Sequence, residues 1–441
     1  MRERWTATQV SALTPDASSL SAARSLASVS RWHALGADDG PPGTVWGLCK
    51  GSGSKPYQTC VDLDDPAFRC SCPSRKIPCK HVLGLLLLWA DGKVDEAPVP
   101  DWVAEWHAGR ASRAAKAEAR RTAAAEPATD AQIRAAARRA AQRDDRVSRG
   151  VAELAQWLDD QVRGGIAGLD RAGYAHWDGV ASRLIDAQAP GLARQVRYLA
   201  GVASSGAGWD QRLLAEFGLL RLLTRAYERI DNLPDDLAAT VRNHVGFTVP
   251  VEQVLASEPV RDVWQVLAQR DIADDRLTTR RTWLIGRESG RPALVLAFAA
   301  ANQPLPVDLV LGTEVDADLC FYPGAAQLRA VVKVRHAAPM RFRSPTGSGT
   351  VEAMLRAYAD ALSSDPWAAN WPGVVRGVVT PGDTWRLVDE TGKGVDVQIG
   401  ADEPWHVVAA AGGRPAEIAG EWSPEGFRPL ALYVDGEVIP A

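Results

Sequence analysis

The sequence has few cysteines, no long apolar run and no large excess of one charge, and each shortage excludes a class of protein. The six cysteines, together with first residues that lack the continuous apolar core of a signal peptide, indicate a reducing compartment. The longest strongly apolar run, Val82 to Ala90, is far shorter than the roughly 20 residues of a membrane span. A net charge of −4 excludes a polycation, so any nucleic-acid binding requires a local basic patch. We therefore expect a cytoplasmic protein without a membrane span.

The sequence also lacks the common catalytic spacings. Its histidines show no His-x-x-x-His or His-Glu-x-x-His pair, and there is no Gly-x-Ser-x-Gly elbow. The stretch from Gly51 to Lys55 lacks the full phosphate-loop pattern and joins two apparent strands, which favours a hairpin turn. We therefore predict that the protein is not an enzyme. An active site assembled from distant positions would leave no such motif, so an enzyme with an unrecognised site in the C-terminal half is our third hypothesis.

What the sequence does contain is a close set of metal-ligand residues: Cys70, Cys72, Cys79 and His81. Three thiolates and one imidazole are a complete tetrahedral ligand set for Zn²⁺. Because protein atoms fill all four positions, we expect one structural zinc ion and no metal chemistry. Unligated core cysteines are the alternative interpretation, and a disulfide is a weaker one. The other cysteines have no comparable spacing and are interpreted as core or half-buried thiols: Cys49, Cys60 and Cys320.

The residues around these ligands predict a ββα arrangement. Thr44 to Cys49 and Tyr57 to Asp62 have the composition of short strands, joined by a turn rich in Gly and Ser. The apolar run from Val82 to Trp89 indicates a buried helix that ends at Gly92. The Cys-x-Cys pair is therefore expected to leave the end of the sheet, with Cys-x-His at the start of the helix.

This segment resembles a SWIM-type zinc finger, whose signature matches Cys70-Ser71-Cys72 and Cys79-Lys80-His81. The resemblance is to bacterial members of the family and covers roughly residues 40 to 95. It implies binding to DNA or to protein partners, with MoxR-like AAA ATPases and von Willebrand A-type proteins as associated classes. We favour an adaptor that acts through protein–protein contacts, because the rest of the chain supplies far more surface than a finger needs for nucleic acid.

DNA binding through the finger is the second hypothesis. Between residues 44 and 93 there are seven basic and four acidic residues, which leaves about +2 once zinc and three thiolates are included. Such a patch predicts weak, salt-sensitive and sequence-tolerant binding to phosphates. The alternative is that these basic residues are simply solvated, or that Lys80 offsets the negative charge of the thiolates. The cations clustered around the metal loop are Arg69, Arg75, Lys76 and Lys80.

The chain divides into four parts, which together predict an α+β multidomain fold. The N-terminal part combines a helix with the finger, and an Ala/Arg-rich linker or solvated helix follows it. Apolar residues at helical spacing then predict a bundle or solenoid. Short strands between turn residues, with one helix from Thr350 to Leu362, predict a mostly-β end that forms a sheet or small barrel. The predicted bounds are residues 1–100 with the finger core at 44–93, 101–129, 130–276 and 277–441.

Overall fold

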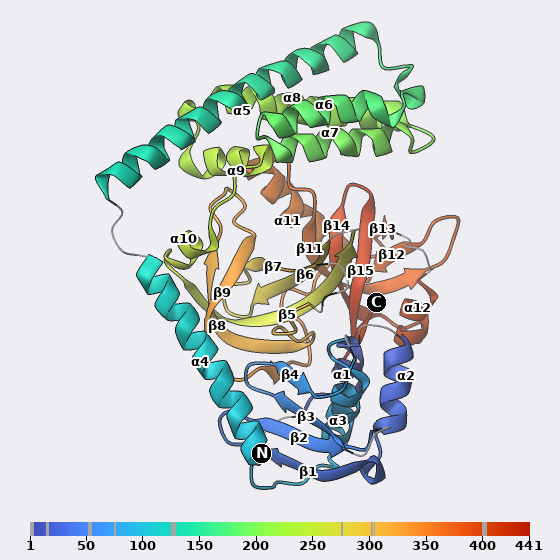
Figure 1. Ribbon diagram of the computed structural model, residues 1–441. Coiled ribbons are helices and arrows are strands. Elements are labelled where there is room, and N and C mark those ends of the chain that lie inside the picture. The colour runs from blue at the N-terminus through green and yellow to red at the C-terminus, as the bar shows by residue number, and fades with distance from the viewer. Residues whose placement is uncertain are drawn as a thin grey trace.

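The protein consists of a finger region, a helical bundle, a β-barrel and a further sheet (Figure 1). The finger region lies at one end, the bundle at the opposite end, and the two C-terminal sheets lie between them. The predicted α+β multidomain class is confirmed, with helices in the middle of the chain and mostly strands after them. The computed structural model describes residues 4–14, 17–51, 55–74, 76–124, 129–274, 277–300, 303, 305–398 and 404–441.

The finger region is built on a four-stranded antiparallel sheet with one long helix against it. The two central strands and the helix lie where the sequence predicted them: β2 (Thr44–Cys49), β3 (Tyr57–Asp62) and α3 (Lys80–Ala90). The outer strands were not predicted: β1 (Trp32–Asp38) and β4 (Ala67–Cys70).

Both outer strands lack the regular alternation from which a strand is predicted. In β1 the pairing with β2 shifts between His33 and Gly36, and Ala34 has a φ of 50°. This irregularity moves side chains from one face of the sheet to the other. The four residues of β4 are too few to show a period.

Helix α3 is buried on several sides, which explains its almost entirely apolar sequence. The sheet covers one side, and α1 (Ala7–Ala12) and α2 (Ala17–Leu26) cover another. Val307 and Val310, from the C-terminal region, belong to the same core. Gly84 allows α2 to approach closely, since a Cβ there would lie 3.0 Å from a leucine Cβ of α2.

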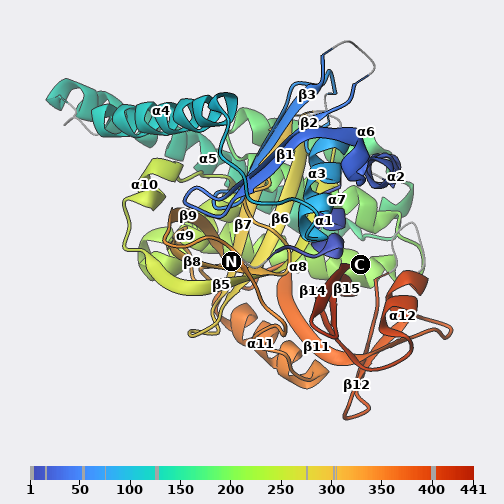
Figure 2. The same cartoon turned by 90° about the horizontal axis from the view of Figure 1, so that it is seen from below.

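The segment predicted as a linker, residues 101–129, is helical as far as Ala124. This helix, α4 (Asp101–Ala124), runs along one side of the molecule, and Figure 2 shows its far end projecting from the body. Alanine and arginine favour a helix, and a solvated helix is the second of the two forms that the composition suggested for this segment. Its first turns pack on the sheet, where Val103 is fully buried beside Trp46.

The middle of the chain forms a bundle and not a solenoid. Four helices contact one another in a ring around Trp177, Phe217 and other apolar side chains, and α9 packs on two of them. Within the described residues, no helix combines the length and apolarity needed to cross a membrane. The helices are α5 (Asp130–Gly164), α6 (Tyr174–Asp186), α7 (Pro190–Ala203), α8 (Trp209–Glu228), α9 (Asp235–Val245) and the short α10 (Val251–Leu255).

The predicted end of the helical part, at residue 276, is wrong. The helices end at Leu255, and Val260 to Ala273 form the long strand β5. A strand that is buried on both faces loses the polar–apolar alternation that identifies it in a sequence. In β5, Trp264 faces one core and Leu267 faces another.

The strands after the bundle first form a closed five-stranded barrel, one of the two arrangements that the sequence suggested. It closes because β8 pairs with both β5 and β9, while β9 also pairs parallel to β7. Trp264 and Leu284 fill its interior. The remaining strands are β6 (Leu277–Gly286), β7 (Pro292–Ala300), β8 (Thr313–Phe321), β9 (Arg329–Arg335) and the short β10 (Met340–Arg341) beside β8.

A second six-stranded sheet packs on the outer face of the barrel. Trp283 and Leu294 of the barrel meet Ala419 and Tyr433 of this sheet, and the Tyr433 hydroxyl donates to the Leu267 carbonyl at 2.8 Å. The sheet, in the order β13-β12-β11-β14-β15-β16, is flanked by two helices. The elements are α11 (Val351–Ser364), β11 (Trp371–Thr380), β12 (Arg386–Asp389), β13 (Gly394–Asp396), α12 (Trp405–Ala411), β14 (Ala416–Ser423), β15 (Gly426–Val434) and β16 (Glu437–Pro440).

Candidate metal centre

The four predicted metal ligands lie together at the junction of β4 and α3. The ligand atoms of Cys70, Cys72, Cys79 and His81 all lie within 4.8 Å of one another. His81 Nδ1 is 3.7 Å from the Cys70 sulfur and 3.8 Å from the Cys79 sulfur. Tetrahedral zinc with ordinary bond lengths places its ligand atoms about 3.5 to 3.8 Å apart. The donor set and these distances therefore fit one structural Zn²⁺.

Local backbone bonds bring the ligands to this position. The β3–β4 pairing continues past the end of β4, because the Ser71 amide donates to the Gln58 carbonyl and the Gln58 amide donates to Ser71 Oγ, both at 2.9 Å. This bonding keeps Cys70 and Cys72 at the edge of the sheet. Cys79 is the extended N-cap residue of α3, so His81 lies in the first turn of the helix.

Two parts of the chain match known family models. Residues 60–90 match the SWIM zinc finger, and residues 142–245 match the SWIM-associated four-helix bundle domain. The chain carries a SWIM zinc finger. The second match spans the last part of α5 through α9, which is the ring of helices described above. No curated protein and no solved structure matches this chain.

The thiols of the SWIM zinc finger shift one another's pKa in opposite directions. A hydrogen bond with Cys79 and then burial raise the pKa of Cys70 to about 12. The same bond to Cys70, helped by the Val82 amide, lowers the pKa of Cys79. Zn²⁺ binds thiolates, so its binding would release the protons of these thiols. Among the described residues this is the one group of three or more metal-ligand side chains.

The other cysteines are core residues, as the sequence indicated. Cys49, Cys60 and Cys320 are fully buried, and none of the six cysteines, all of which are described, forms a disulfide. Burial is the main reason that the pKa of Cys49 rises to about 11 and that of Cys60 to about 12. The thiols of Cys49 and Cys60 therefore stay protonated at neutral pH.

The four basic residues predicted around the metal loop have different surroundings. Arg69 donates from Nη1 to the Trp102 carbonyl at 3.3 Å, so it helps to hold α4 on the SWIM zinc finger. Lys76 and Lys80 have exposed side chains, and Arg75 lies outside the described residues. A role of these residues in nucleic-acid binding stays a prediction.

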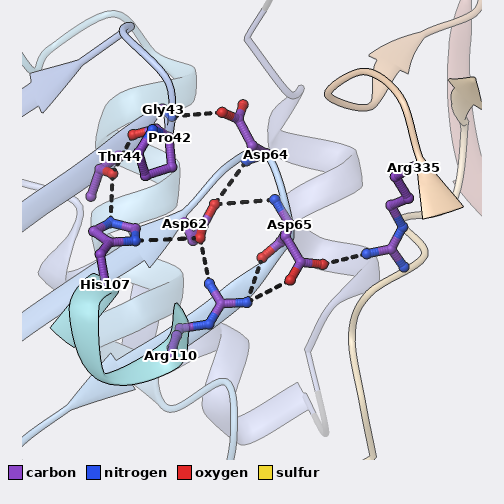
Figure 3. Close-up of polar contacts among 9 residues, drawn as sticks. All are labelled: Pro42, Gly43, Thr44, Asp62, Asp64, Asp65, His107, Arg110 and Arg335. Atoms are coloured by element: carbon purple, nitrogen blue, oxygen red, sulfur yellow. Dashed lines mark hydrogen bonds and ion pairs between the residues drawn. The ribbon is translucent and has the colours of Figure 1, made fainter. Parts of the chain in front are cut away.

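An ionic network that the sequence did not reveal locks α4 onto the SWIM zinc finger (Figure 3). At its centre is Asp62, whose side chain is 6% exposed. Arg110 of α4 donates to this carboxylate, and His107 Nδ1 lies 3.5 Å from it. The amides of Asp64 and Asp65 donate to the other carboxylate oxygen at 3.0 and 3.1 Å. The one available signal was His107 and Arg110 themselves, which are three residues apart and therefore share a helix face.

The same network reaches the barrel through Asp65. Arg110 donates to one oxygen of Asp65 at 2.7 Å, and Arg335 of β9 donates to the other (Figure 3). Arg335 also donates to Asp308 at 3.1 Å. The turn after β3, which the sequence indicated only as a break between strands, therefore connects three parts of the protein.

This junction should weaken in acid. Burial lowers the pKa of His107 below 6.5, and the attraction of Asp62 only partly opposes this effect. The unfolded state therefore binds a proton more readily, so the contribution of His107 is complete above pH 6.5 and is lost as the pH falls towards the folded pKa. We expect tryptic cleavage of α4 to accelerate between pH 7.5 and 5.5, relative to a denatured control substrate. The same acceleration in His107→Gln would contradict this assignment.

Proposed function

We propose that the protein is a zinc-stabilised adaptor that binds a protein partner through the outer face of α8. The observation that carries this proposal is a row of exposed leucines on a bundle helix. Leu214 and Leu222 are 50% and 46% exposed. Both lie on the solvent side of α8, whereas Leu213 and Phe217 lie on the side that is buried in the bundle. Exposed apolar rows of this kind mark interaction sites more often than isolated exposed residues do.

The shape and charge of this face favour an amphipathic helix with acidic residues. Leu214, Gly218 and Leu222 are four residues apart in succession, so they form one stripe along α8. In the described part of the chain, and apart from the neighbouring residues and backbone of α8 itself, no atom lies within 4 Å of the point where a Cβ of Gly218 would be, which leaves a shallow gap for a side-chain ridge of the partner. Arg229, which is exposed, follows at the C-terminal end and complements an acidic partner residue, whereas the exposed Arg225 lies 3.8 Å from Glu228 of the same helix.

The family resemblance supplies two partner classes to test, the MoxR-like AAA ATPases and the von Willebrand A-type proteins. We expect one such purified protein from the same cell to bind the full zinc-loaded chain in titration calorimetry. The double variant Leu214→Asp, Leu222→Asp should weaken binding at least about tenfold, because burying a leucine stabilises a contact by about 1.5 to 3 kcal/mol.

Ile133→Asp is the matched control, since Ile133 is 55% exposed on the projecting start of α5, away from this face. Equal affinity of the double variant and this control would contradict a docking site on α8. Failure of both partner classes to bind would contradict the adaptor role itself.

DNA binding through the finger loop is the second candidate, which the exposed Lys76 and Lys80 favour. This candidate requires that the protein retards a DNA duplex in a gel at low salt, and that replacing Lys80 abolishes this retardation. We also propose that the protein is not an enzyme, because the sequence lacks the common catalytic motifs. Its free thiols support the further proposal that it is cytoplasmic.

A further inference from the structure

The connectivity of the barrel is that of OB-type barrels. The strands β5, β6 and β7 are consecutive and antiparallel, β9 pairs parallel to β7, and β8 closes the ring between β9 and β5. In such barrels the second and third strands present the face that commonly binds oligonucleotides. Here these strands are β6 and β7. Because a fold alone does not assign a function, the side chains on this face must carry the argument.

The second sheet covers only part of the β6–β7 face. Trp283 and Leu294 lie in the core between the barrel and the second sheet, and Leu296 packs at its border. Towards the end of β7 this cover is missing, and Phe298 is 48% exposed. Phe298 is paired with Thr279, while Arg281 is paired with Leu296, so Phe298 and Arg281 are diagonal neighbours on one face. An exposed aromatic ring therefore lies on the same face as Arg281, whose guanidinium group leans towards Trp283 and lies 5.4 Å from the centre of that ring.

Arg281 belongs to an unusual group of charges. It stands directly opposite Arg270 on β5, a cross-strand pair of like charges that destabilises a sheet unless an anion lies between them. Glu421 of β14, which is 2% exposed, partly supplies that anion. It accepts from Arg281 Nε at 2.7 Å, from Arg270 Nη1 at 3.2 Å and from Trp283 Nε1 at 2.7 Å.

A third guanidinium leaves this group with excess positive charge. Arg428 of β15 stands opposite Glu421, and its buried Nε has no hydrogen-bond partner within the described part of the chain. Burial and then the charge of Arg270 lower the pKa of Arg428. The carboxylate of Glu425 is also near, but Glu425 is exposed and accepts a hydrogen bond from Tyr198. Three cations therefore face two carboxylates, and one donor is unused.

We propose that this surface, the arginine–phenylalanine face (Arg270, Arg281, Arg428 and Phe298), binds single-stranded nucleic acid. The guanidinium groups contact phosphates, and the Phe298 ring stacks on one base. A single strand is required because the bases of a duplex are stacked on one another and leave no free face for Phe298. This site lies on the barrel and is separate from both the zinc finger loop and the proposed α8 docking face.

The test is fluorescence anisotropy of the full zinc-loaded chain with a labelled 20-mer of thymidine, at 50 and 200 mM NaCl. We expect binding at the lower salt and at least about fivefold weaker binding by Phe298→Ala, because one stacked base contributes a factor of that size or more. Phe298→Trp should retain binding. Arg428→Gln should reduce the dependence of log K on log salt by about 0.7, the value for one phosphate contact on a single strand.

Both replaced side chains have matched controls elsewhere on the surface. Tyr174→Ala removes an aromatic ring that is 78% exposed on α6, and Arg356→Gln removes a guanidinium that is 72% exposed on α11. Both controls should bind like the unaltered protein. The proposal would be overturned by a lack of binding at 50 mM salt or by equal affinity for a duplex of the same length. It would also be overturned if Phe298→Ala had no effect on binding, because that result would indicate only a general attraction for polyanions.

Discussion

Replacing Cys72 by Ser or His81 by Ala is expected to abolish zinc binding and to unfold residues 44–93. The metal joins the end of β4 to the start of α3, and the binding energy of a structural zinc site contributes directly to folding. Structural zinc binds isolated finger peptides with about 10 to 16 kcal/mol, which is as large as the whole stability of a typical domain. Metal analysis and proteolysis of residues 44–93 measure the loss.

The bundle should survive in these variants. Among the described residues, its core is formed by Val147 to Val245 with Phe247 and Trp367 packed against it, and none of these side chains belongs to the finger core. Helical circular dichroism should therefore fall only in part. Cys60→Ala is the control, because Cys60 is a buried cysteine of the same sheet that is not a ligand, and this variant should retain one zinc per chain. Complete loss of helical signal in Cys72→Ser would contradict the independence of the bundle.

Replacing Asp62 by Ala is expected to release α4 from the finger. The change leaves Arg110 without its buried partner and leaves two backbone amides unpaired. Removing one partner of a buried ion pair typically lowers the free energy of unfolding by about 3 to 5 kcal/mol. Hydrogen exchange of the amides at residues 101–112 reports the free energy of this local opening. In the unaltered protein these amides should exchange slowly, and in Asp62→Ala much faster.

Asp65→Ala provides the comparison for this prediction. Asp65 also pairs with Arg110 and Arg335, but its side chain is 59% exposed, so its removal should cost only about 0 to 1 kcal/mol. Equal acceleration of exchange in the two variants would show that burial of Asp62 is not what holds α4.

The zinc site could be predicted because all of its information is local. Four ligands within twelve positions, flanked by β2, β3 and α3, follow from spacing and composition alone. The central bundle was also predictable, since apolar residues such as Leu213, Phe217 and Leu220 repeat at the helical period.

What the sequence could not predict depends on contacts between distant segments. Strand β5 was interpreted as helix because cores on both of its faces remove the alternation of a strand. In the network around Asp62, Asp65 pairs with Arg110, which is 45 positions away, and with Arg335, which is 270 positions away. No local sequence pattern predicts such pairs. The arginine–phenylalanine face likewise exists only after β14 and β15 have packed on the barrel.

The shared core of α3 has a consequence for synthesis on the ribosome. Val307 and Val310 belong to that core, and Gln9 of α1 donates to the carbonyls of Leu311 and Gly312 at 3.3 and 3.2 Å. A nascent chain that has emerged only through the finger has ligands for zinc but lacks these covering residues. Part of the apolar surface of α3 is then exposed to water and to chaperones until more than 200 further residues have been translated. The first structured part of the chain to emerge is thus among the last to be completed.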